Sequence, residues 1–204
     1  MQNLQDTSES LISRLHQNTK LKIVITTHHK PDGDAMGSSL ALNIYLKIIG
    51  HHVSVITPTD YPRFLHWMPG HEDVIVYEGH ENKCLILTHE ADFIFCLDFN
   101  NLNRINEYGT VVRTAKGRKV MIDHHLEPEG FDDYRFWTNE ASSTCELIYE
   151  FIKKAGDTEL ITKELADCLY TGMMTDTGSF RYRGTSAGTH RIIAELIDKG
   201  AKTV

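Results

Sequence analysis

Short apolar runs, several of them rich in β-branched residues, recur along the first part of the chain and constrain its fold most strongly. Helical patterns fit between several of these runs. Strands that alternate with helices, and that are apolar throughout, are typical of a parallel sheet covered on both faces. We therefore predict an α/β fold with a mainly parallel five-stranded sheet and helices on both faces. The expected strands are Leu21–Thr27, Val53–Thr57, Val74–Tyr77, Asp92–Leu97 and Lys119–Ile122.

Apolar residues at helical spacing lie between and after these runs. The clearest expected helix within the sheet region is Ser38–Ile49, which is followed by Gly50, a common residue at helix C-termini. After Asp123 the pattern changes, and we predict that a helical segment follows the sheet. The other expected helices are one around Leu11 to Leu15, then Leu102–Ala115, Ser143–Ala155, Lys163–Met174 and Ala187–Lys199.

The charge balance and the cysteines exclude several classes of protein. The 204 residues include 28 Asp and Glu against 21 Lys and Arg, a net charge of −7, which argues against a broad basic surface for duplex nucleic acid. No apolar run approaches the length of about 18 residues that spans a membrane, and no secretory signal is recognisable. The four cysteines lack C-x-x-C spacing, which favours buried free thiols in a reducing cytoplasm.

Histidines and aspartates follow three of the expected strands directly. The first strand runs into His28 and the segment Pro31-Asp32-Gly33-Asp34, the fourth ends at Asp98, and the fifth ends at Asp123-His124-His125. Because ligands bind at the carboxyl ends of strands in open α/β sheets, we expect these side chains to share one site. Asp176, at the end of a predicted helix, is a further candidate.

The mixture of imidazoles and carboxylates indicates the kind of ion that such a site would hold. Histidine together with aspartate suits Mn²⁺ or Zn²⁺ better than Ca²⁺, which prefers oxygen ligands alone. The candidate groups exceed the needs of one ion, and a carboxylate shared between two ions is typical of two-metal hydrolysis. The sequence therefore favours a two-metal site.

Each of these strand-end motifs also has a purely structural interpretation. Asp32-Gly33 in a β-to-α loop is commonly a turn with a helix N-cap, and Asp98 can cap a helix that follows its strand. Only the joint placement at strand ends favours a metal site. The segment from Asp32 begins like an EF-hand loop but has Asn43 where that loop needs Glu. Gly184–Gly188 matches G-x-S-x-G, but the acids and the histidine that follow share one short helix, so a triad cannot form.

The ordered motifs of the chain resemble those of the DHH phosphoesterase superfamily. Within it, Gly172–Phe180 and Ala141–Thr144 look most like the branch of bifunctional oligoribonucleases and pAp phosphatases. Exopolyphosphatase-related, pyrophosphatase and cyclic-dinucleotide phosphodiesterase relatives share the motifs and remain alternatives. The matching motifs are His28-x-x-Pro31-Asp32-Gly33-Asp34-Ala35-x-Gly37-Ser38, Asp98, Asp123-His124-His125 and Asp176-Thr177-Gly178.

This resemblance implies two Mn²⁺ ions, with Mg²⁺ or Co²⁺ as alternatives, and Asp98 would bridge them. It implies that His125 faces the substrate phosphate and that Asp123 orients the histidines, so we count Asp98, Asp123 and His125 as catalytic. Arg181 and Arg183, which follow the last motif, are candidate contacts to the substrate phosphate. The implied ligands are His28, Asp32 and Asp98 for one ion, and Asp34, Asp98, His124 and Asp176 for the other.

The resemblance further implies a phosphoesterase that degrades short oligoribonucleotides in the 3′-to-5′ direction, or 3′-phosphoadenosine 5′-phosphate, or both. Its partners would be small phosphorylated nucleotides or short single strands, and a homodimer is among the assemblies it allows. A non-catalytic metal-binding module is the alternative from another class, but such modules usually lose ligands and none is missing here. We expect residues 1–200 to form the catalytic domain and residues 201–204 to begin a linker to a substrate-binding domain.

Most of the histidines fall outside these motifs. Of the twelve, His28, His124 and His125 follow strands among carboxylates, and His29 is undecided. The others, including the pair His51-His52 after Gly50, are expected to lie mostly on the surface.

Overall fold

A parallel sheet forms the centre of the molecule, as the alternation of strands and helices predicts. The computed structural model describes residues 4–17 and 19–203, with side chains from Ser8 onward. The six described strands pair in parallel in the order β3-β2-β1-β4-β5-β6. They are β1 (Lys22–Thr27), β2 (His52–Thr57), β3 (Ile75–Val76), β4 (Phe93–Leu97), β5 (Arg118–Asp123) and β6 (Tyr134–Trp137).

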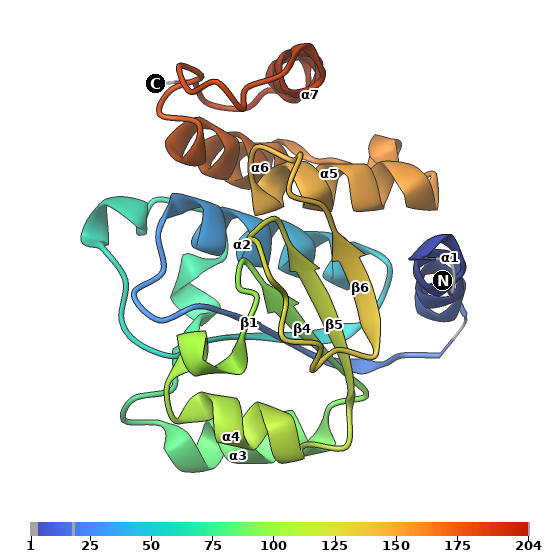
Figure 1. Cartoon of the computed structure of the whole chain (residues 1–204), viewed down its shortest axis with the longest axis vertical. Coiled ribbons are helices and arrows are strands. Elements are labelled where there is room, and N and C mark those ends of the chain that lie inside the picture. The colour runs from blue at the N-terminus through green and yellow to red at the C-terminus, as the bar shows by residue number, and fades with distance from the viewer. Residues whose placement is uncertain (1–3, 18, 204) are drawn as a thin grey trace.

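Helices cover both faces of this sheet (Figure 1). On one face α2 lies next to the strands, α5 and α6 pack over it, and α7 is outermost; α3 and α4 cover the opposite face, and α1 lies beside β6. Short 3₁₀ turns, among them η1 (Arg63–Leu65) and η3 (Leu102–Ile105), connect the elements. The helices are α1 (Leu4–Leu15), α2 (Gly33–Ile48), α3 (Glu81–Glu90), α4 (Tyr108–Thr114), α5 (Thr144–Ala155), α6 (Lys163–Asp176) and α7 (Ala187–Asp198).

The predicted α/β fold is confirmed, and the structure adds a sixth strand. Strand β6 was not predicted because it lies at the sheet edge, where all four of its residues are only half-buried and Arg135 interrupts the apolar pattern. It pairs with β5 through Val120 and Tyr134, among others. An edge strand needs no continuous apolar run, so its sequence signal is weak.

Two helix boundaries differ from the prediction. The expected helix Leu102–Ala115 is divided into η3 and α4, because the backbone at Asn106 turns to a positive φ of 53°. Helix α2 begins at Gly33 rather than at Ser38. The side chain of Asp32 explains the earlier start, since it accepts hydrogen bonds from the N–H groups of Asp34 and Ala35 and caps the helix.

Helix α2 is buried almost all round because it lies between the sheet and α6. Two glycines allow the close approach. A Cβ at Gly37 would lie 2.6 Å from the carbonyl oxygen of Cys168, and one at Gly172 would lie 2.2 Å from Sγ of Cys145 and 2.9 Å from Oδ1 of Asp34. The helix packing that glycine permits thus brings Asp34 against α6 and α5.

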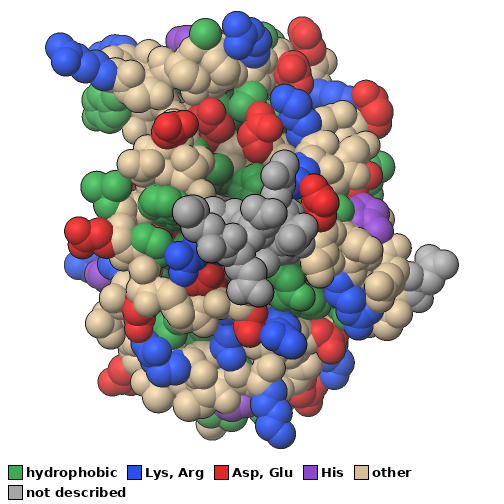
Figure 2. Space-filling model, turned by 45° about the vertical axis from the view of Figure 1, so that its right-hand side comes forward, with side chains coloured by type: hydrophobic (Ala, Val, Ile, Leu, Met, Phe, Trp, Pro, Cys, Tyr) green, Lys and Arg blue, Asp and Glu red, His purple; other side chains and the backbone are tan. Residues whose placement is uncertain are grey.

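The surface agrees with the charge balance. On the face in Figure 2, acidic and basic side chains are interspersed rather than gathered into a basic patch. Among the described helices, none has the length and apolar character required to cross a membrane.

Candidate metal centre

Three strands and one helix deliver imidazoles and carboxylates to the carboxyl edge of the sheet. His28 follows β1, Asp98 follows β4, His124 follows β5, and Asp176 ends α6. The Nε2 atom of His28 lies 3.4 Å from Oδ2 of Asp98, and Nε2 of His124 lies 3.6 Å from Oδ1 of Asp98 and 3.5 Å from Oδ2 of Asp176. The structure therefore brings together side chains that are far apart in the sequence.

The donor atoms form overlapping groups in which every atom lies within 4.8 Å of the others. Asp98 belongs to two groups and His124 to two, so the groups make one continuous cluster. All six ligands that the sequence resemblance implies belong to it. The groups are His28, Asp32 and Asp98; Asp34, His124 and Asp176; and Asp98, His124 and His125.

The two oxygens of Asp98 face different histidines. Oδ2 faces His28, whereas Oδ1 faces His124 and also accepts a hydrogen bond of 2.8 Å from the hydroxyl of Thr144. The residue is 2 % exposed and its backbone has a positive φ of 64°, a conformation that costs free energy in a non-glycine residue. The strained backbone conformation thus lies at the residue whose carboxylate joins the groups of the cluster.

The N-terminus of α5 holds the buried carboxylate of Asp34. Its Oδ2 accepts from the N–H of Thr144 over 2.6 Å, and its Oδ1 accepts from the N–H of Cys145 over 2.9 Å. Both are N–H groups of the first helical turn, which lack partners within the helix and carry the positive end of its dipole. Ser143 caps the same helix by accepting from the N–H of Glu146. Backbone donors of this helix therefore fix the position of the Asp34 carboxylate.

Backbone carbonyls orient the two histidines of the cluster. Nδ1 of His28 lies 2.8 Å from the carbonyl oxygen of His29, and Nδ1 of His124 lies 3.3 Å from that of Ala141. A carbonyl only accepts, so each Nδ1 carries the proton. Nε2 is therefore the nitrogen of each ring that faces the carboxylates, and a metal-ligating histidine has the same orientation with the same outer hydrogen bond.

The concentration of carboxylates in the cluster also suits the binding of metal cations. Within the described part of the chain, its carboxylates form ion pairs only with histidines. Burial, and then the charges of Asp98 and Asp176, raise the pKa of Asp34 well above its ordinary value, and burial raises the pKa of Asp176. Burial lowers the pKa of His124, but its contact with Asp98 and the charges of Asp34 and Asp98 outweigh this and raise it to about 9. Metal cations would relieve the repulsion between these carboxylates.

His125 is held differently from the other two histidines. Its Nδ1 donates to Oδ1 of Asp123 over 2.7 Å, and the indole N–H of Trp137 donates to its backbone carbonyl over 2.6 Å. Because Nδ1 is occupied by Asp123, the available nitrogen is Nε2, on a ring that is about one-third exposed. Asp123 is fully buried, and its Oδ2 has no hydrogen-bond partner in the described structure. Of the two neighbouring histidines, Asp123 thus accepts a hydrogen bond from His125.

The two predicted phosphate contacts lie outside the cluster. The Nε of Arg181 donates to the carbonyl of Gly178 over 2.8 Å, and Arg181 and Arg183 are both exposed. Neither forms an ion pair with a carboxylate of the cluster among the residues that the structure describes. Their role as contacts to the substrate phosphate stays a prediction.

Sequence reasoning did not assign a role to Thr144 or Trp137. Thr144 was noted only as part of a helix opening, and Trp137 lies on the strand that was not predicted. The expectation that most of the other histidines lie on the surface is wrong for His51. The residue is 6 % exposed, and its Nε2 lies 2.9 Å from the carbonyl of Leu15.

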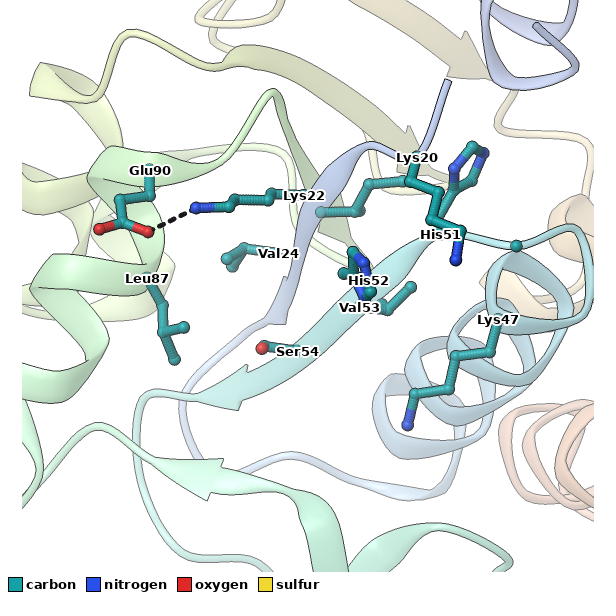
Figure 3. Close-up of a pocket in the computed structure, with 12 residues that line it drawn as sticks. Lys20, Lys22, Val24, Lys47, His51, His52, Val53, Ser54, Leu87 and Glu90 are labelled. Atoms are coloured by element: carbon teal, nitrogen blue, oxygen red, sulfur yellow. Dashed lines mark hydrogen bonds and ion pairs between the residues drawn. The ribbon is translucent and has the colours of Figure 1, made fainter. Parts of the chain in front are cut away.

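A cavity of about 730 Å³ lies at the opposite edge of the sheet, near the amino ends of β1 and β2 (Figure 3). Lys20, Lys22, Lys47 and His52 are among its lining residues. Lys22 points toward Glu90 and pairs with it over 2.7 Å. Because this cavity lies away from the strand ends that carry the cluster, it is not part of the candidate metal centre.

A family model and curated relatives both match most of the chain. Residues 22–173 match the model of the DHH family, N-terminal domain. The chain is 31% identical to the bifunctional oligoribonuclease and PAP phosphatase of Thermus thermophilus over 94% of this chain and 54% of that protein. It is 29% identical to the Bacillus subtilis protein of the same description, over 86% of this chain and 52% of that protein. The chain thus spans about half the length of these curated relatives.

A solved structure is similar over nearly the whole chain. It is an exopolyphosphatase-related protein from Bacteroides fragilis, with a TM-score of 0.93 and 44% sequence identity. The similarity covers 97% of this chain and 58% of that one.

Proposed function

The chain belongs to the DHH family, and from that premise we propose that it is a two-metal phosphoesterase. The observation that carries this proposal is the orientation of Asp98, whose two oxygens face His28 and His124 separately. A carboxylate in that position can ligate two ions at once. His28, Asp32 and Asp98 would hold one ion, and Asp34, Asp98, His124 and Asp176 would hold the other.

The mixed donor set supports Mn²⁺, with Mg²⁺ or Co²⁺ as alternatives. When bound, the ions would supply a nucleophilic water near neutral pH and neutralise charge that builds on the phosphoryl oxygens. The chain's own contribution is to hold its ligands rigidly, through the N-terminus of α5 and the carbonyls that orient His28 and His124.

His125 is the residue that would contact the substrate phosphate. Its Nδ1 donates to Asp123, which leaves Nε2 to donate to a phosphoryl oxygen when the ring carries both protons. Asp123 acts through His125 by fixing its orientation. Arg181 and Arg183, both exposed on the segment after α6, are proposed as further contacts to the substrate phosphate.

The substrates that we propose are short oligoribonucleotides, degraded from the 3′ end, and 3′-phosphoadenosine 5′-phosphate. The names of the Thermus and Bacillus relatives support this choice. We propose that residues 1–200 are the catalytic domain and that residues 201–204 begin a linker to a substrate-binding domain. The four buried free cysteines support action in the reducing cytoplasm.

A substrate panel tests the proposal. The chain is incubated with and without Mn²⁺ and with 3′-phosphoadenosine 5′-phosphate, di- to pentaribonucleotides, pyrophosphate, polyphosphate or a cyclic dinucleotide. We expect Mn²⁺-dependent release of phosphate or mononucleotides from the first two classes. Preferential hydrolysis of polyphosphate, which the description of the Bacteroides fragilis structure suggests, would replace the substrate assignment. No Mn²⁺-dependent hydrolysis of any of these would contradict the proposal itself.

A further inference from the structure

An apolar pocket lies beside the candidate metal centre and has no role in the arrangement described so far. It has a volume of about 540 Å³ and lies between the η1 region, α6 and residues 202–203. Phe64, Leu65 and Trp67 form one wall, and Tyr170 and Met174 of α6 form another. Phe64 is 68% exposed and Trp67 is 45% exposed, so two large aromatic rings remain open to solvent. Aromatic walls with a few polar groups are typical of sites for small ligands.

The pocket and the metal centre are adjacent along α6. Thr175 lines the pocket, and the next residue, Asp176, belongs to the metal cluster. The side chain of Thr175 also packs against the first turn of α2, since a Cβ at Gly33 would lie 2.4 Å from its Oγ1. Gly33 in turn separates Asp32 from Asp34 in the chain. A molecule whose phosphate lay in the cluster would therefore have its neighbouring groups close to this pocket.

The rim of the pocket carries a positive charge. The ammonium group of Lys202 lies 5.5 Å from the centre of the Trp67 ring, within the range of a cation–π interaction. Because Lys202 and Trp67 both line the pocket, this contact places a cation beside an aromatic wall. Aromatic faces beside a cation suit a nucleotide, because its base can stack while its phosphate is attracted.

We propose that this pocket binds the base of a nucleotide whose phosphate occupies the metal centre. The inference rests on the proposed phosphoesterase function and assigns its preference for nucleotides over base-free phosphates to the catalytic domain itself. Stacking depends on the π-face that every base has, so the pocket would accept bases with little sequence preference. Trp67 and Phe64 are thus specificity-determining residues rather than catalytic ones.

A matched pair of substrates tests the proposal. The Mn²⁺-loaded chain is assayed with the dinucleotide pApA and with the same compound carrying abasic sugars. We expect Trp67→Ala to raise KM for pApA about tenfold, and at least fivefold more than for the abasic compound, with the larger change in KM rather than kcat. Ile86→Ala is the control, because Ile86 is an exposed apolar residue on α3, on the opposite face of the sheet. Equal KM changes for both substrates would overturn the inference.

A binding measurement separates this inference from the proposed function. The two tryptophans are Trp67 and Trp137, so a change in fluorescence that the wild type shows and Trp67→Phe lacks reports on Trp67 alone. We expect adenosine 5′-monophosphate to quench its fluorescence and ribose 5-phosphate to leave it unchanged. If no substrate is hydrolysed but this quenching is seen, the phosphoesterase function fails and the base pocket stands. If substrates are hydrolysed but both compounds leave the fluorescence unchanged, the base pocket fails alone.

Discussion

The hydroxyl of Thr144 donates to Oδ1 of Asp98 over 2.8 Å, across 46 residues of sequence. The backbone N–H of the same threonine donates to Asp34 over 2.6 Å. One residue at the start of α5 therefore restrains two of the carboxylates that we propose as metal ligands. Much of the order of the site comes from this helix terminus, which contributes no ligand itself.

Removing the hydroxyl of Thr144 is expected to weaken metal binding. Thr144→Val keeps the backbone N–H for Asp34 but leaves Asp98 without its restraint, so we expect Mn²⁺ affinity to fall by about 10–100-fold. Isothermal titration with Mn²⁺ measures the effect. Thr114→Val is the matched control, because the hydroxyl of Thr114 donates to a carbonyl on α4, away from the cluster. Equal affinities for the two variants would exclude the restraint on Asp98.

Gly172→Ala is expected to destabilise the fold and disturb the site together. The added Cβ would lie 2.2 Å from Sγ of Cys145 and 2.9 Å from Oδ1 of Asp34, where overpacking costs about 1–3 kcal/mol. The midpoint of urea unfolding measures the loss. Gly184→Ala serves as the comparison, since no atom lies within 4 Å of a Cβ at that position. An unchanged midpoint for Gly172→Ala would show that the helices do not approach this closely.

Trp137 is expected to act on catalysis through His125. Trp137→Phe removes the indole donor to the carbonyl of His125, a loss worth about 1–3 kcal/mol that loosens the histidine. We expect kcat to fall about tenfold while the Mn²⁺ affinity stays within a factor of two. Tyr134→Phe, on the same strand, controls for general effects on β6. A parallel loss of metal affinity and kcat would mean that Trp137 supports the fold rather than His125.

The pH dependence of stability should report the contact between His16 and Asp157. Burial lowers the pKa of His16, but the carbonyl of Ile12 and then Asp157, 2.8 Å away, outweigh it and raise the pKa above 6.5. A raised pKa in the folded chain stabilises it fully below pH 6.5 and loses this effect as the pH rises through the folded pKa. Because the pair is partly exposed, we expect less than about 1 kcal/mol.

The measurement compares urea unfolding of the wild type and His16→Gln between pH 5.5 and 8.5. The wild type should be more stable at the acidic end, and the difference should shrink toward the alkaline end. A difference that grew with pH would contradict the raised pKa of His16.

The sequence located the site through strand ends, but it could not supply the contacts that hold it. His28, Asp98 and His124 follow apolar runs, and the parallel topology brings such ends together whatever the loops do. Thr144 contacts Asp34 across 110 residues, and no local pattern predicts that pairing. Strand β6 was not predicted because an edge strand needs little apolar character. For the same reason, no role was predicted for Trp137, which lies on that strand.

The structural and the functional interpretations of Asp32 are compatible with each other. Asp32 caps α2, as its place before Gly33 suggests, and its Oδ1 also lies 3.9 Å from Nε2 of His28. For His51 the sequence-based expectation was wrong. Its position directly after Gly50 indicated a surface residue, but its side chain is buried and links the end of α1 to the start of β1. Its Nδ1 accepts from the N–H of Leu21 and its Nε2 donates to the carbonyl of Leu15. Position relative to a helix end was a poor guide to its burial.

The bridging position of Asp98 is the central claim, and counting bound ions tests it most directly. Equilibrium dialysis against Mn²⁺ is performed on the wild type, on Asp98→Asn and on Asp198→Asn, whose aspartate is exposed at the end of α7. We predict two tightly bound ions per chain for the wild type and for Asp198→Asn, and loss of both from Asp98→Asn at the same free Mn²⁺ concentration. One ion per wild-type chain, or two ions retained by Asp98→Asn, would contradict the account.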